Sequence, residues 1–317
     1  MLGSREAHID FFVEARGSVG MGHLSRVASL MKQLKSRGQA SRLHLFADHY
    51  GKAYAKRRGL NAEGGSEKTP ALVAVIDAVT LPRRALEKIA AYPVRIVISP
   101  SFKSMHLATH YFARSLPISG QMPEQTYVDV NADYAFVTSA SGLIKSSNLE
   151  TIKLGICMTA GRSTIGFQIA ELMLTVPAVR EIRIIASDRL PKSLRAQNHV
   201  IHCRESLDPW SFFSNCNRFI GGDGLMVSEA VAMLKPTFSL VSHSTNPKNL
   251  ELISRGAIFP FTWDDVESGV LSRSLIDEGL IQNLIQACNL AFSEEKSEQL
   301  AWSILRVLRS SEKGEGS

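Results

Sequence analysis

A glycine-rich segment near the amino terminus has the residue types best suited to chemistry. Residues 17–26 read Gly-Ser-Val-Gly-Met-Gly-His-Leu-Ser-Arg. The glycines allow a tight turn and a close approach of a ligand, and a helix that starts after them offers free N–H groups to an anion. His23 stands at the predicted helix start, where a neutral imidazole suits a general base that activates a hydroxyl or water. The alternative is a plain tight turn in which His23 caps the helix or packs.

A second glycine segment occurs two hundred residues later. Residues 221–230 read Gly-Gly-Asp-Gly-Leu-Met-Val-Ser-Glu-Ala. The glycines could admit a diphosphate against a helix N-terminus, and Glu229, about one turn into that helix, could accept hydrogen bonds from both ribose hydroxyls. In the alternative interpretation, Asp223 caps the helix and Glu229 is a solvated helix acid.

A third candidate segment, residues 244–249, reads Ser-Thr-Asn-Pro-Lys-Asn. The amides of Asn246 and Asn249 and the ammonium group of Lys248 suit sugar hydroxyls or phosphate. A well-capped turn is the alternative, because the residues before Pro247 are good helix-start residues.

Apolar periodicity places the first two segments between a strand and a helix. The first half predicts strands over 9–15, 42–47, 72–76, 94–98 and 134–138, and helices over 23–34 and 82–91. The second half predicts strands over 152–158, 182–186, 200–203, 218–220 and 237–241, and helices through 169–173 and over 209–215, 226–233 and 246–254. This alternation predicts parallel, doubly wound sheets, whose ligands bind at the carboxyl ends of strands. With a polar linker at 139–150, we predict domains over 1–145 and 151–310 and a disordered tail over 311–317.

Composition narrows the class of protein. A length of 317 residues predicts two domains of about 150 residues each. The net charge of +6 is scattered, and no basic stretch is interleaved with aromatic residues, which argues against nucleic-acid binding. The four cysteines form no CxxC pair, so neither a zinc site nor a redox pair is indicated. We find no signal segment and no membrane span, which predicts a cytoplasmic protein and leaves a peripheral membrane contact open.

In their order and separation, the glycine segments resemble the GT-B superfamily, particularly the nucleotide-sugar hydrolases of the pseudaminic acid pathway and the N-acetylglucosaminyltransferase that makes lipid II. Residues 19–26 resemble the hydrolases' Ile-Gly-x-Gly-His-x-x-Arg motif. Residues 227–230 and 246–256 resemble the nucleotide-sugar site of both groups. The resemblance implies an α/β fold of two Rossmann-like domains facing across a cleft, with an acceptor domain, a donor domain and a UDP-sugar between them.

The resemblance also implies roles for individual residues. His23 takes the role of the catalytic base, Glu229 contacts the ribose, and Asn246 contacts the sugar or phosphate. The other residues expected at the substrate are Gly20, Gly22, Arg26, Asp77, Lys248 and Asn249. Those expected at the nucleotide are Gly222, Asp223, Gly224, Ser228, Arg162 and Ser163.

The sequence departs from these families at several positions. Where the hydrolases carry Asp-His-Tyr, residues 77–79 are Asp-Ala-Val, so the aromatic hydroxyl is missing, and their Ile-Asp-Asp-Leu is matched by Ile-Ser-Pro-Ser at 98–101. In the donor segments, Met226 replaces a hydroxyl residue and Pro247 replaces a glutamine. Where relatives often have Gly-Gly-x-Asp, residues 158–164 read Met-Thr-Ala-Gly-Arg-Ser-Thr, whose arginine and hydroxyl groups could substitute as phosphate ligands.

We therefore expect an inverting, metal-independent glycosyltransferase that uses a UDP-sugar in bacterial-type surface glycan or glycoconjugate biosynthesis. His23 would remove a proton from a hydroxyl of a saccharide or glycoconjugate acceptor, and the helix terminus near Gly224 would stabilise the leaving nucleoside diphosphate. No cofactor is expected, since the nucleotide sugar is the substrate. Two alternatives stay open: a UDP-sugar hydrolase of nonulosonic acid synthesis, in which His23 activates water, and a non-catalytic sugar-nucleotide binding protein, motivated by Met226 and Pro247.

Overall fold

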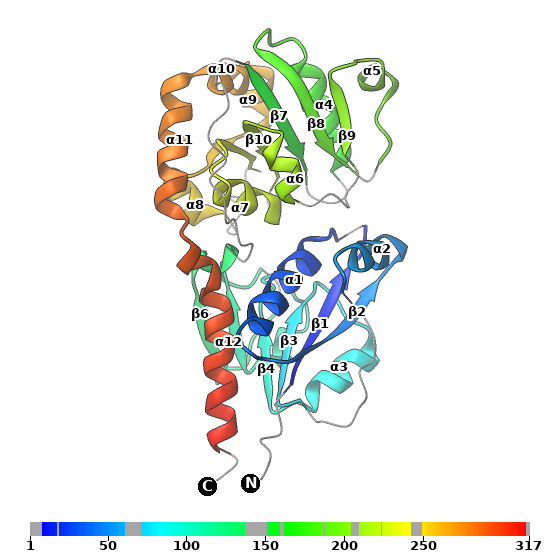
Figure 1. Ribbon diagram of the computed structural model, residues 1–317, viewed down its shortest axis with the longest axis vertical. Helices are drawn as coiled ribbons and strands as arrows, with labels where there is room; N and C mark the ends of the chain where they lie inside the picture. Colours follow the sequence, from blue (N-terminus) through cyan, green and yellow to red (C-terminus); the bar gives the residue numbers. More distant parts are fainter. Residues whose placement is uncertain are drawn as a thin grey trace. The chain divides into compact units, whose positions relative to one another are not determined.

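The computed structural model divides the chain into two compact units, Met1–Val137 with Glu295–Ser317, and Thr138–Glu294 (Figure 1). The structure describes residues 8–17, 19–60, 71–118, 120–136, 151–158, 162–186, 188–203, 209–222, 224–241 and 249–314. The predicted linker, residues 139–150, lies outside these ranges.

The first unit is built on a parallel six-stranded sheet in the order β2-β1-β3-β4-β5-β6. Its strands are β1 (Ile9–Ala15), β2 (Ser41–Ala47), β3 (Val73–Asp77), β4 (Val94–Val97), β5 (His110–Ala113) and β6 (Tyr127–Val130). Its helices are α1 (Gly22–Lys35), α2 (His49–Arg57), α3 (Arg83–Ala90) and α12 (Glu294–Gly314), with 3-10 turns η1 (Met105–Leu107) and η2 (Ala132–Ala135). Because the chain runs from β1 outward to β2 and then returns to β3 on the other side of β1, the strand order reverses between β1 and β3, where such sheets bind ligands.

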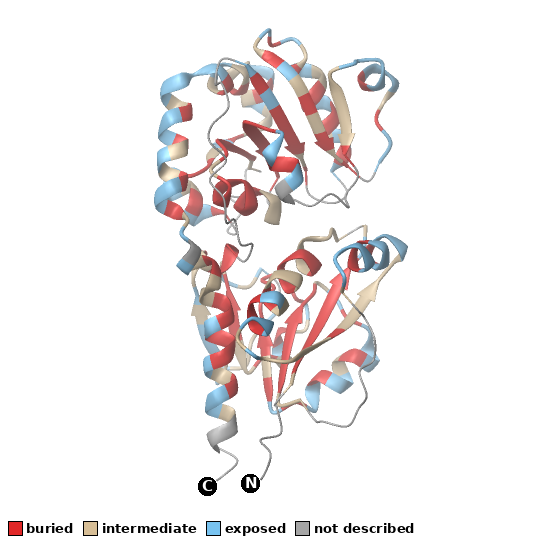
Figure 2. Ribbon diagram, in the orientation of Figure 1, coloured by how far each residue is buried: buried red, intermediate tan, exposed pale blue. Residues whose placement is uncertain are grey.

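Strand β1 is buried on both faces, as the centre of a parallel sheet requires. Successive side chains alternate between the faces. Phe11 and Val13 face the core that includes residues of α1 and α12, whereas Phe12 faces the core formed with α3. Figure 2 shows the central strands of both sheets in the colour of buried residues. Helices on both faces therefore leave the strand ends as the place for a polar site.

The C-terminal helix α12 belongs to the first unit, which corrects the predicted extent of the second domain. Its apolar residues that join the first core are Leu300, Ala301, Ile304, Leu305 and Leu308. Gln33 of α1 donates to the carbonyl of Ser297 at 3.1 Å, and Arg37 pairs with Glu298 at 2.5 Å. The predicted disordered tail is shortened too, because the helix continues to Gly314. These apolar residues of α12 lie on one side of the helix, and that side is buried in the core of the first unit.

The second unit repeats the architecture, with a parallel sheet in the order β12-β11-β10-β7-β8-β9. Its strands are β7 (Ile152–Cys157), β8 (Val179–Ile185), β9 (Val200–Cys203), β10 (Arg218–Gly221), β11 (Thr237–Leu240) and β12 (Phe259–Phe261). Its helices are α4 (Ser163–Met173), α5 (Lys192–Arg195), α6 (Pro209–Ser214), α7 (Leu225–Ala232), α8 (Leu250–Ser254), α9 (Trp263–Glu267), α10 (Val270–Ile276) and α11 (Glu278–Ala291). Here the strand order reverses between β7 and β10, which places the ligand-binding end of this sheet after those two strands.

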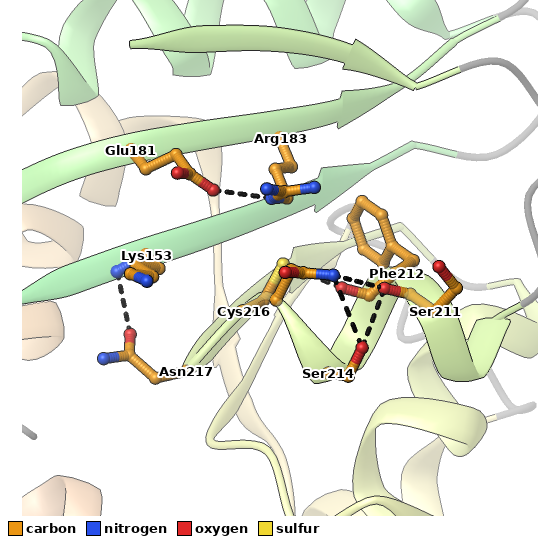
Figure 3. Close-up of polar contacts among 9 residues, drawn as sticks. Lys153, Glu181, Arg183, Ser211, Phe212, Ser214, Cys216 and Asn217 are labelled. Carbon is orange, nitrogen blue, oxygen red and sulfur yellow. Dashed lines mark hydrogen bonds and ion pairs between the residues drawn. The ribbon is translucent and has the colours of Figure 1, made fainter. Parts of the chain in front are cut away.

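The side chain of Asn217 holds the segment between α6 and β10 against strand β7 (Figure 3). The side-chain oxygen of Asn217 accepts the amide of Lys153 at 2.9 Å, and its amide donates to the carbonyl of Thr151 at 2.6 Å. The thiol of Cys216 donates to the carbonyl of Phe212 at 3.4 Å, and burial raises the pKa of this thiol to about 12. The Asn217 contacts hold the start of β10 beside β7, and the Cys216 bond lies at the end of α6. An un-ionised buried thiol is not a nucleophile.

Several elements differ from the sequence prediction. The predicted strand over 134–138 is wrong in its described part, because residues 132–135 form η2 after Asn131, whose side chain accepts the amide of Asp133. Helix α2 and strands β5, β6 and β12 were not predicted. The side chains of β6 are mostly exposed and β12 contains Pro260, so neither shows the apolar alternation of a half-buried strand.

Candidate active site

The first glycine segment forms a closed loop between β1 and α1. The amide of Gly20 donates to the carbonyl of Arg16 at 2.7 Å, and Gly20 has a φ of 89°, which glycine adopts without strain. The amide of Gly17 donates to Asp48 at 2.8 Å, and the same carboxylate accepts the amide of Gly51 at 3.0 Å as the N-cap of α2. Burial acts to raise the pKa of Asp48, but these amide hydrogen bonds outweigh it and lower the pKa. Asp48 therefore anchors the loop as an anion.

Helix α1 starts directly after this loop. Its N-cap Met21 makes no side-chain cap hydrogen bond, and the amide of Ser25 donates to the carbonyl of Met21 at 2.9 Å. The amides of Gly22 and His23 lie in the first turn, where a helix leaves its N–H groups without intrahelical partners. The first turn carries no acidic residue. The predicted helix start after the glycines is thus confirmed, and binding of an anion there stays a prediction.

His23, Arg26 and Asp77 come together at the carboxyl end of β3. Arg26 donates from Nε to Oδ2 of Asp77 at 2.7 Å and from Nη2 to Oδ1 at 2.6 Å. Nδ1 of His23 lies 3.5 Å from the same Oδ1. His23 and Arg26 are three residues apart and share one face of α1, while Asp77 pairs in register with Val13 of β1. The structure therefore joins three residues that the sequence singled out separately.

Burial determines the charge state of His23 beside Arg26 and Asp77. The side chain of Asp77 is fully buried and that of Arg26 is 7% exposed, whereas that of His23 is 15% exposed. Burial lowers the pKa of His23; Asp77 and Glu14 oppose this effect, and the charge of Arg26 adds to it. The imidazole is therefore neutral at pH 7, the state that a general base requires. Direct contact of Arg26 or Asp77 with a substrate stays a prediction.

Glu14 is a residue of this region that the sequence reasoning missed. It is 1% exposed, and its Oε2 accepts the amides of Val79 at 2.9 Å and Thr80 at 2.8 Å. The guanidinium of Arg16 lies 3.6 Å from its Oε1. Glu14 thus fixes the loop that follows Asp77. The available signal was a carboxylate in the otherwise largely apolar strand Ile-Asp-Phe-Phe-Val-Glu-Ala.

A buried phenol lies within electrostatic reach of Arg26. Tyr111 of β5 is fully buried, and its hydroxyl donates to the carbonyl of Ser115 at 2.6 Å. Burial raises the pKa of Tyr111, and the charges of Arg26 and Arg114 act against that rise. Because this hydroxyl is buried and engaged, it does not replace the aromatic hydroxyl missing at Val79.

The second glycine segment is a tight turn between β10 and α7. The amide of Gly222 donates to the carbonyl of Cys157 at 3.2 Å, and its carbonyl accepts the hydroxyl of Ser239 at 2.8 Å. A Cβ on Gly221 would lie 2.8 Å from a side-chain carbon of α7, so the helix packs closely on the strand end. Helix α7 begins after Gly224, whose backbone is extended. The predicted strand, turn and helix are confirmed, and Asp223 lies outside the described residues.

The two residues predicted at the nucleotide within α7 are both buried. Ser228 is 0% exposed and Glu229 is 3% exposed. The alternative interpretation of Glu229 as a solvated helix acid is therefore wrong. Contact of either residue with a ribose stays a prediction.

A second helix start lies on the neighbouring strand of this sheet. Strands β7 and β10 pair so that Cys157 is opposite Gly221, and their carboxyl ends lie side by side. Helix α4 begins after β7 with Arg162 as its N-cap and Ser163 as its first residue, and no side-chain cap hydrogen bond forms. Arg162 is exposed and Ser163 is buried. Two helix N-termini and the exposed side chain of Arg162 therefore follow adjacent strands, an arrangement that suits a diphosphate.

The side chain of Asn249 is an unsatisfied polar group. It is 1% exposed, and both Oδ1 and Nδ2 are buried with no hydrogen-bond partner among the described residues. Such groups are rare, because leaving one unsatisfied costs about 1–3 kcal/mol. A sugar hydroxyl both donates and accepts, which fits the predicted role of this amide. Asn246 and Lys248 lie outside the described residues.

The described ranges contain neither a metal-binding group of side chains nor a membrane-spanning helix. No group of three or more His, Cys, Asp or Glu side chains there is placed to hold a metal ion. None of the described helices is both long enough and apolar enough to span a bilayer.

Comparisons with known proteins identify the fold. No protein-family model and no curated protein matches the sequence. Among solved structures, Staphylococcus aureus MnaA with UDP is 14% identical, with a TM-score of 0.64 over 96% of this chain and 97% of that one. A UDP-GlcNAc 2-epimerase from Neisseria meningitidis bound to UDP-GlcNAc is 11% identical, with a TM-score of 0.61 over 94% and 100%. The glycosyltransferase SnogD from Streptomyces nogalater is 13% identical, with a TM-score of 0.56 over 96% and 100%.

The chain therefore has the α/β GT-B fold, with two Rossmann-like domains, as the sequence predicted. The resemblance to the GT-B superfamily is confirmed at the level of the fold. At sequence identities this low, the similarity does not identify the substrate or the reaction of this chain.

Proposed function

We propose that this GT-B chain is an enzyme acting on a nucleotide-activated sugar, and that it is an inverting glycosyltransferase with a UDP-sugar donor. One observation carries the proposal: a neutral, partly exposed imidazole beside a buried carboxylate at the carboxyl edge of the first sheet. The UDP and UDP-GlcNAc bound in two similar structures support the class of donor.

In this proposal His23 is the general base. A lone pair on its imidazole accepts the proton of an acceptor hydroxyl as that oxygen attacks the anomeric carbon of the donor. The bond between that carbon and the diphosphate oxygen breaks, and the nucleoside diphosphate leaves with the electron pair. Attack opposite the leaving group inverts the configuration. The carboxylate of Asp77 stabilises the imidazolium that forms.

The second unit would hold the donor. The starts of α4 and α7 suit the diphosphate, with Arg162 adding a positive charge. Glu229 would accept hydrogen bonds from the ribose, and the unsatisfied amide of Asn249 would bind hydroxyls of the sugar. A saccharide or glycoconjugate is the proposed acceptor, in a cytoplasmic step of surface glycan synthesis.

A second candidate function is epimerisation of the donor sugar, favoured by the similarity to UDP-GlcNAc 2-epimerases over most of the chain. An epimerase needs no acceptor and returns an intact nucleotide sugar. A hydrolase would use the same histidine to activate water and would release free sugar. These reactions give different products from one substrate, so one experiment separates them.

The nucleotide is identified first by a thermal-shift screen with UDP, GDP, CMP and dTDP. A ligand that binds the folded state alone stabilises it by about 2.7 kcal/mol at one hundred times its Kd. We expect UDP to raise the melting temperature and the other three to leave it nearly unchanged. A shift with GDP, CMP or dTDP instead of UDP would refute the UDP assignment.

The reaction is then followed by NMR with UDP-GlcNAc, first alone and then with a mixture of saccharide acceptors. A transferase leaves the donor intact until an acceptor is added, whereas an epimer or free N-acetyl sugar appearing without acceptor indicates the other two reactions. We expect His23→Ala to lower turnover by about 100-fold or more while UDP still binds. The exposed His106→Ala serves as the matched control and keeps full activity. Full activity in His23→Ala would refute the assignment of the base.

A further inference from the structure

The ion pair between Arg26 and Asp77 fixes the orientation of the Asp77 carboxylate and also balances its charge. Both oxygens of Asp77 accept hydrogen bonds from Arg26, at 2.6 and 2.7 Å. Two parallel N–H groups of a planar guanidinium hold the plane of a carboxylate, which a point charge such as lysine cannot do. Asp77 is fully buried at the end of the strand Val-Ala-Val-Ile-Asp. An unpaired carboxylate there would be strongly destabilising, so the pair persists.

The oxygen that faces His23 is also held by Arg26. Oδ1 of Asp77 accepts Nη2 of Arg26 at 2.6 Å and lies 3.5 Å from Nδ1 of His23. A carboxylate oxygen accepts two hydrogen bonds, so a proton on Nδ1 can also be directed at Oδ1. A separation of 3.5 Å is longer than a formed hydrogen bond, and such catalytic contacts often shorten when substrate binds. With the proton on Nδ1, the lone pair of the neutral imidazole is on Nε2.

We propose that Arg26 is a positioning residue for His23: its bidentate hold on Asp77 keeps Oδ1 turned toward Nδ1, so that Nε2 is the atom that accepts the substrate proton. This inference deepens the proposed function, because it assigns Arg26 and Asp77 to the base rather than to the substrate. It also gives a reason why an arginine follows the histidine by three residues, since that spacing brings both side chains to one carboxylate.

The charged groups around His23 affect its pKa, and this effect can be measured. The groups that face it are Asp77 from β3, Glu14 from β1 and Arg26 from its own helix. Burial and the charge of Arg26 disfavour the protonated imidazole, whereas the charge of Asp77, a hydrogen bond with the backbone of Asp77 and the charge of Glu14 favour it. Removing Arg26 therefore leaves the charge of Asp77 unopposed and raises the pKa of His23, and removing the charge of Asp77 lowers that pKa.

The first test uses the unaltered full chain without substrate. Nitrogen-15 NMR of the imidazole distinguishes the two neutral tautomers, and the variant His23→Gln identifies the His23 signals among the nine histidines. We expect Nδ1 to carry the proton and Nε2 to be unprotonated above the pKa. A proton on Nε2 would overturn the proposal, and the tautomer itself is read in the unaltered protein.

The second test titrates His23 in variants of the full chain. We expect the titration midpoint to rise in Arg26→Met, to fall in Asp77→Asn, and to rise less in Arg26→Lys, which keeps the charge but loses the bidentate contact. Arg37→Met is the matched control, because Arg37 pairs with Glu298 near the other end of α1 and its loss should leave the midpoint unchanged. An unchanged midpoint in folded Arg26→Met would overturn the proposal.

The same variants separate failure of this inference from failure of the proposed function. If the tautomer and the midpoints behave as expected but no nucleotide sugar turns over, the positioning role stands and the enzyme assignment fails. If turnover occurs, the acid limb of the pH–rate profile should move to higher pH in Arg26→Met. Turnover should fall by about 100-fold or more in Asp77→Asn, which loses the acceptor for Nδ1–H. An acid limb that stays in place would contradict the proposal even with an active enzyme.

Discussion

At the scale of single residues, the first sheet contains two buried aspartates with similar partners and different surroundings. Asp77 binds Arg26 through both oxygens and faces His23, which is partly exposed. Asp10, on β1, binds Arg42 through both oxygens at 2.6 and 2.9 Å and also accepts the hydroxyl of Tyr92. Asp10 also faces an imidazole, that of His44 at 3.3 Å, whose side chain is 19% exposed. The two sites therefore differ in position: Asp10 lies at the amino end of β1, whereas Asp77 ends β3 at the carboxyl edge, where such sheets bind ligands.

The first prediction at this scale concerns the acid stability that Asp10 confers. Burial acts to raise its pKa, but hydrogen bonds from His44, Arg42 and Tyr92 outweigh burial and hold the pKa well below 3.8. A carboxyl group with a depressed pKa stabilises the fold above its unfolded pKa, and this contribution is lost as the pH falls toward the folded pKa. We expect Asp10→Asn to lower the free energy of unfolding at pH 7 by about 3 kcal/mol.

Urea unfolding measured from pH 7 down to about pH 3 checks this sign. The deficit of Asp10→Asn relative to the unaltered protein should narrow below about pH 4, because the native carboxylate loses its advantage there. Asp264→Asn, at an exposed position of α9, is the control and should change stability by less than about 0.5 kcal/mol. A deficit of constant size across this range would contradict the assigned cause.

At the scale of elements, the glycine loop that precedes His23 depends on how α2 packs against β1. Asp48 begins α2 and binds the amide of Gly17 in the loop. Gly51 lies where α2 meets β1: a Cβ there would collide with the carbonyl of Ala15 and would lie 2.7 Å from the Cβ of Ala47. Only glycine allows this close approach, so the position of α2 and the shape of the glycine loop before α1 are coupled.

We predict that Gly51→Ala destabilises the protein by about 2–3 kcal/mol and lowers turnover, because α2 must move away from β1 and carry Asp48 with it. Gly38→Ala is the matched control. Gly38 has a φ of 77° but no atom within 4 Å of its added Cβ, so it should cost only about 1 kcal/mol of backbone strain and leave turnover unchanged. Urea midpoints and turnover together test this difference. Equal effects of the two substitutions would show that close packing is not the cause.

At the scale of the whole molecule, each unit has a core of its own, and the chain contributes to the first unit from both of its ends. Helix α12 places Ile304 in the first core, where it is 0% exposed. Ile281 of α11 is likewise 0% exposed, but in the second core. Figure 2 shows buried positions along α12 between exposed ones. Ile281 and Ile304 are 23 positions apart in the sequence, yet they stabilise different units.

This division predicts where a core mutation acts. Ile304→Ala should remove about 2–4 kcal/mol from the first unit, so amide hydrogen exchange should accelerate in β1, β3 and β4 and stay unchanged in β7, β8 and β10. Ile281→Ala should give the reverse pattern. Hydrogen-exchange mass spectrometry of the full-length variants measures both. If Ile304→Ala accelerated exchange chiefly in the second sheet, the assignment of α12 to the first unit would be wrong.

The sequence by itself determined the features that depend on neighbouring residues. Apolar periodicity identified most of the buried strands, although not β5, and several of the helices that follow them, because burial on a sheet or a helix repeats at a fixed spacing. The glycine segments predicted the two strand-to-helix turns, since residues such as Gly20 and Gly221 meet conformational or packing limits that only glycine satisfies. The resemblance of these segments to GT-B proteins then implied the GT-B fold and the role of His23.

The tertiary structure decided which distant groups meet. The pairing of Arg26 with Asp77 spans 51 residues, and the amides that hold Glu14 belong to a loop 65 residues away. No local pattern specifies such partners, because they depend on strand order and register. The same holds for α12, which was not predicted: its place in the first core depends on which sheet face is free to receive it.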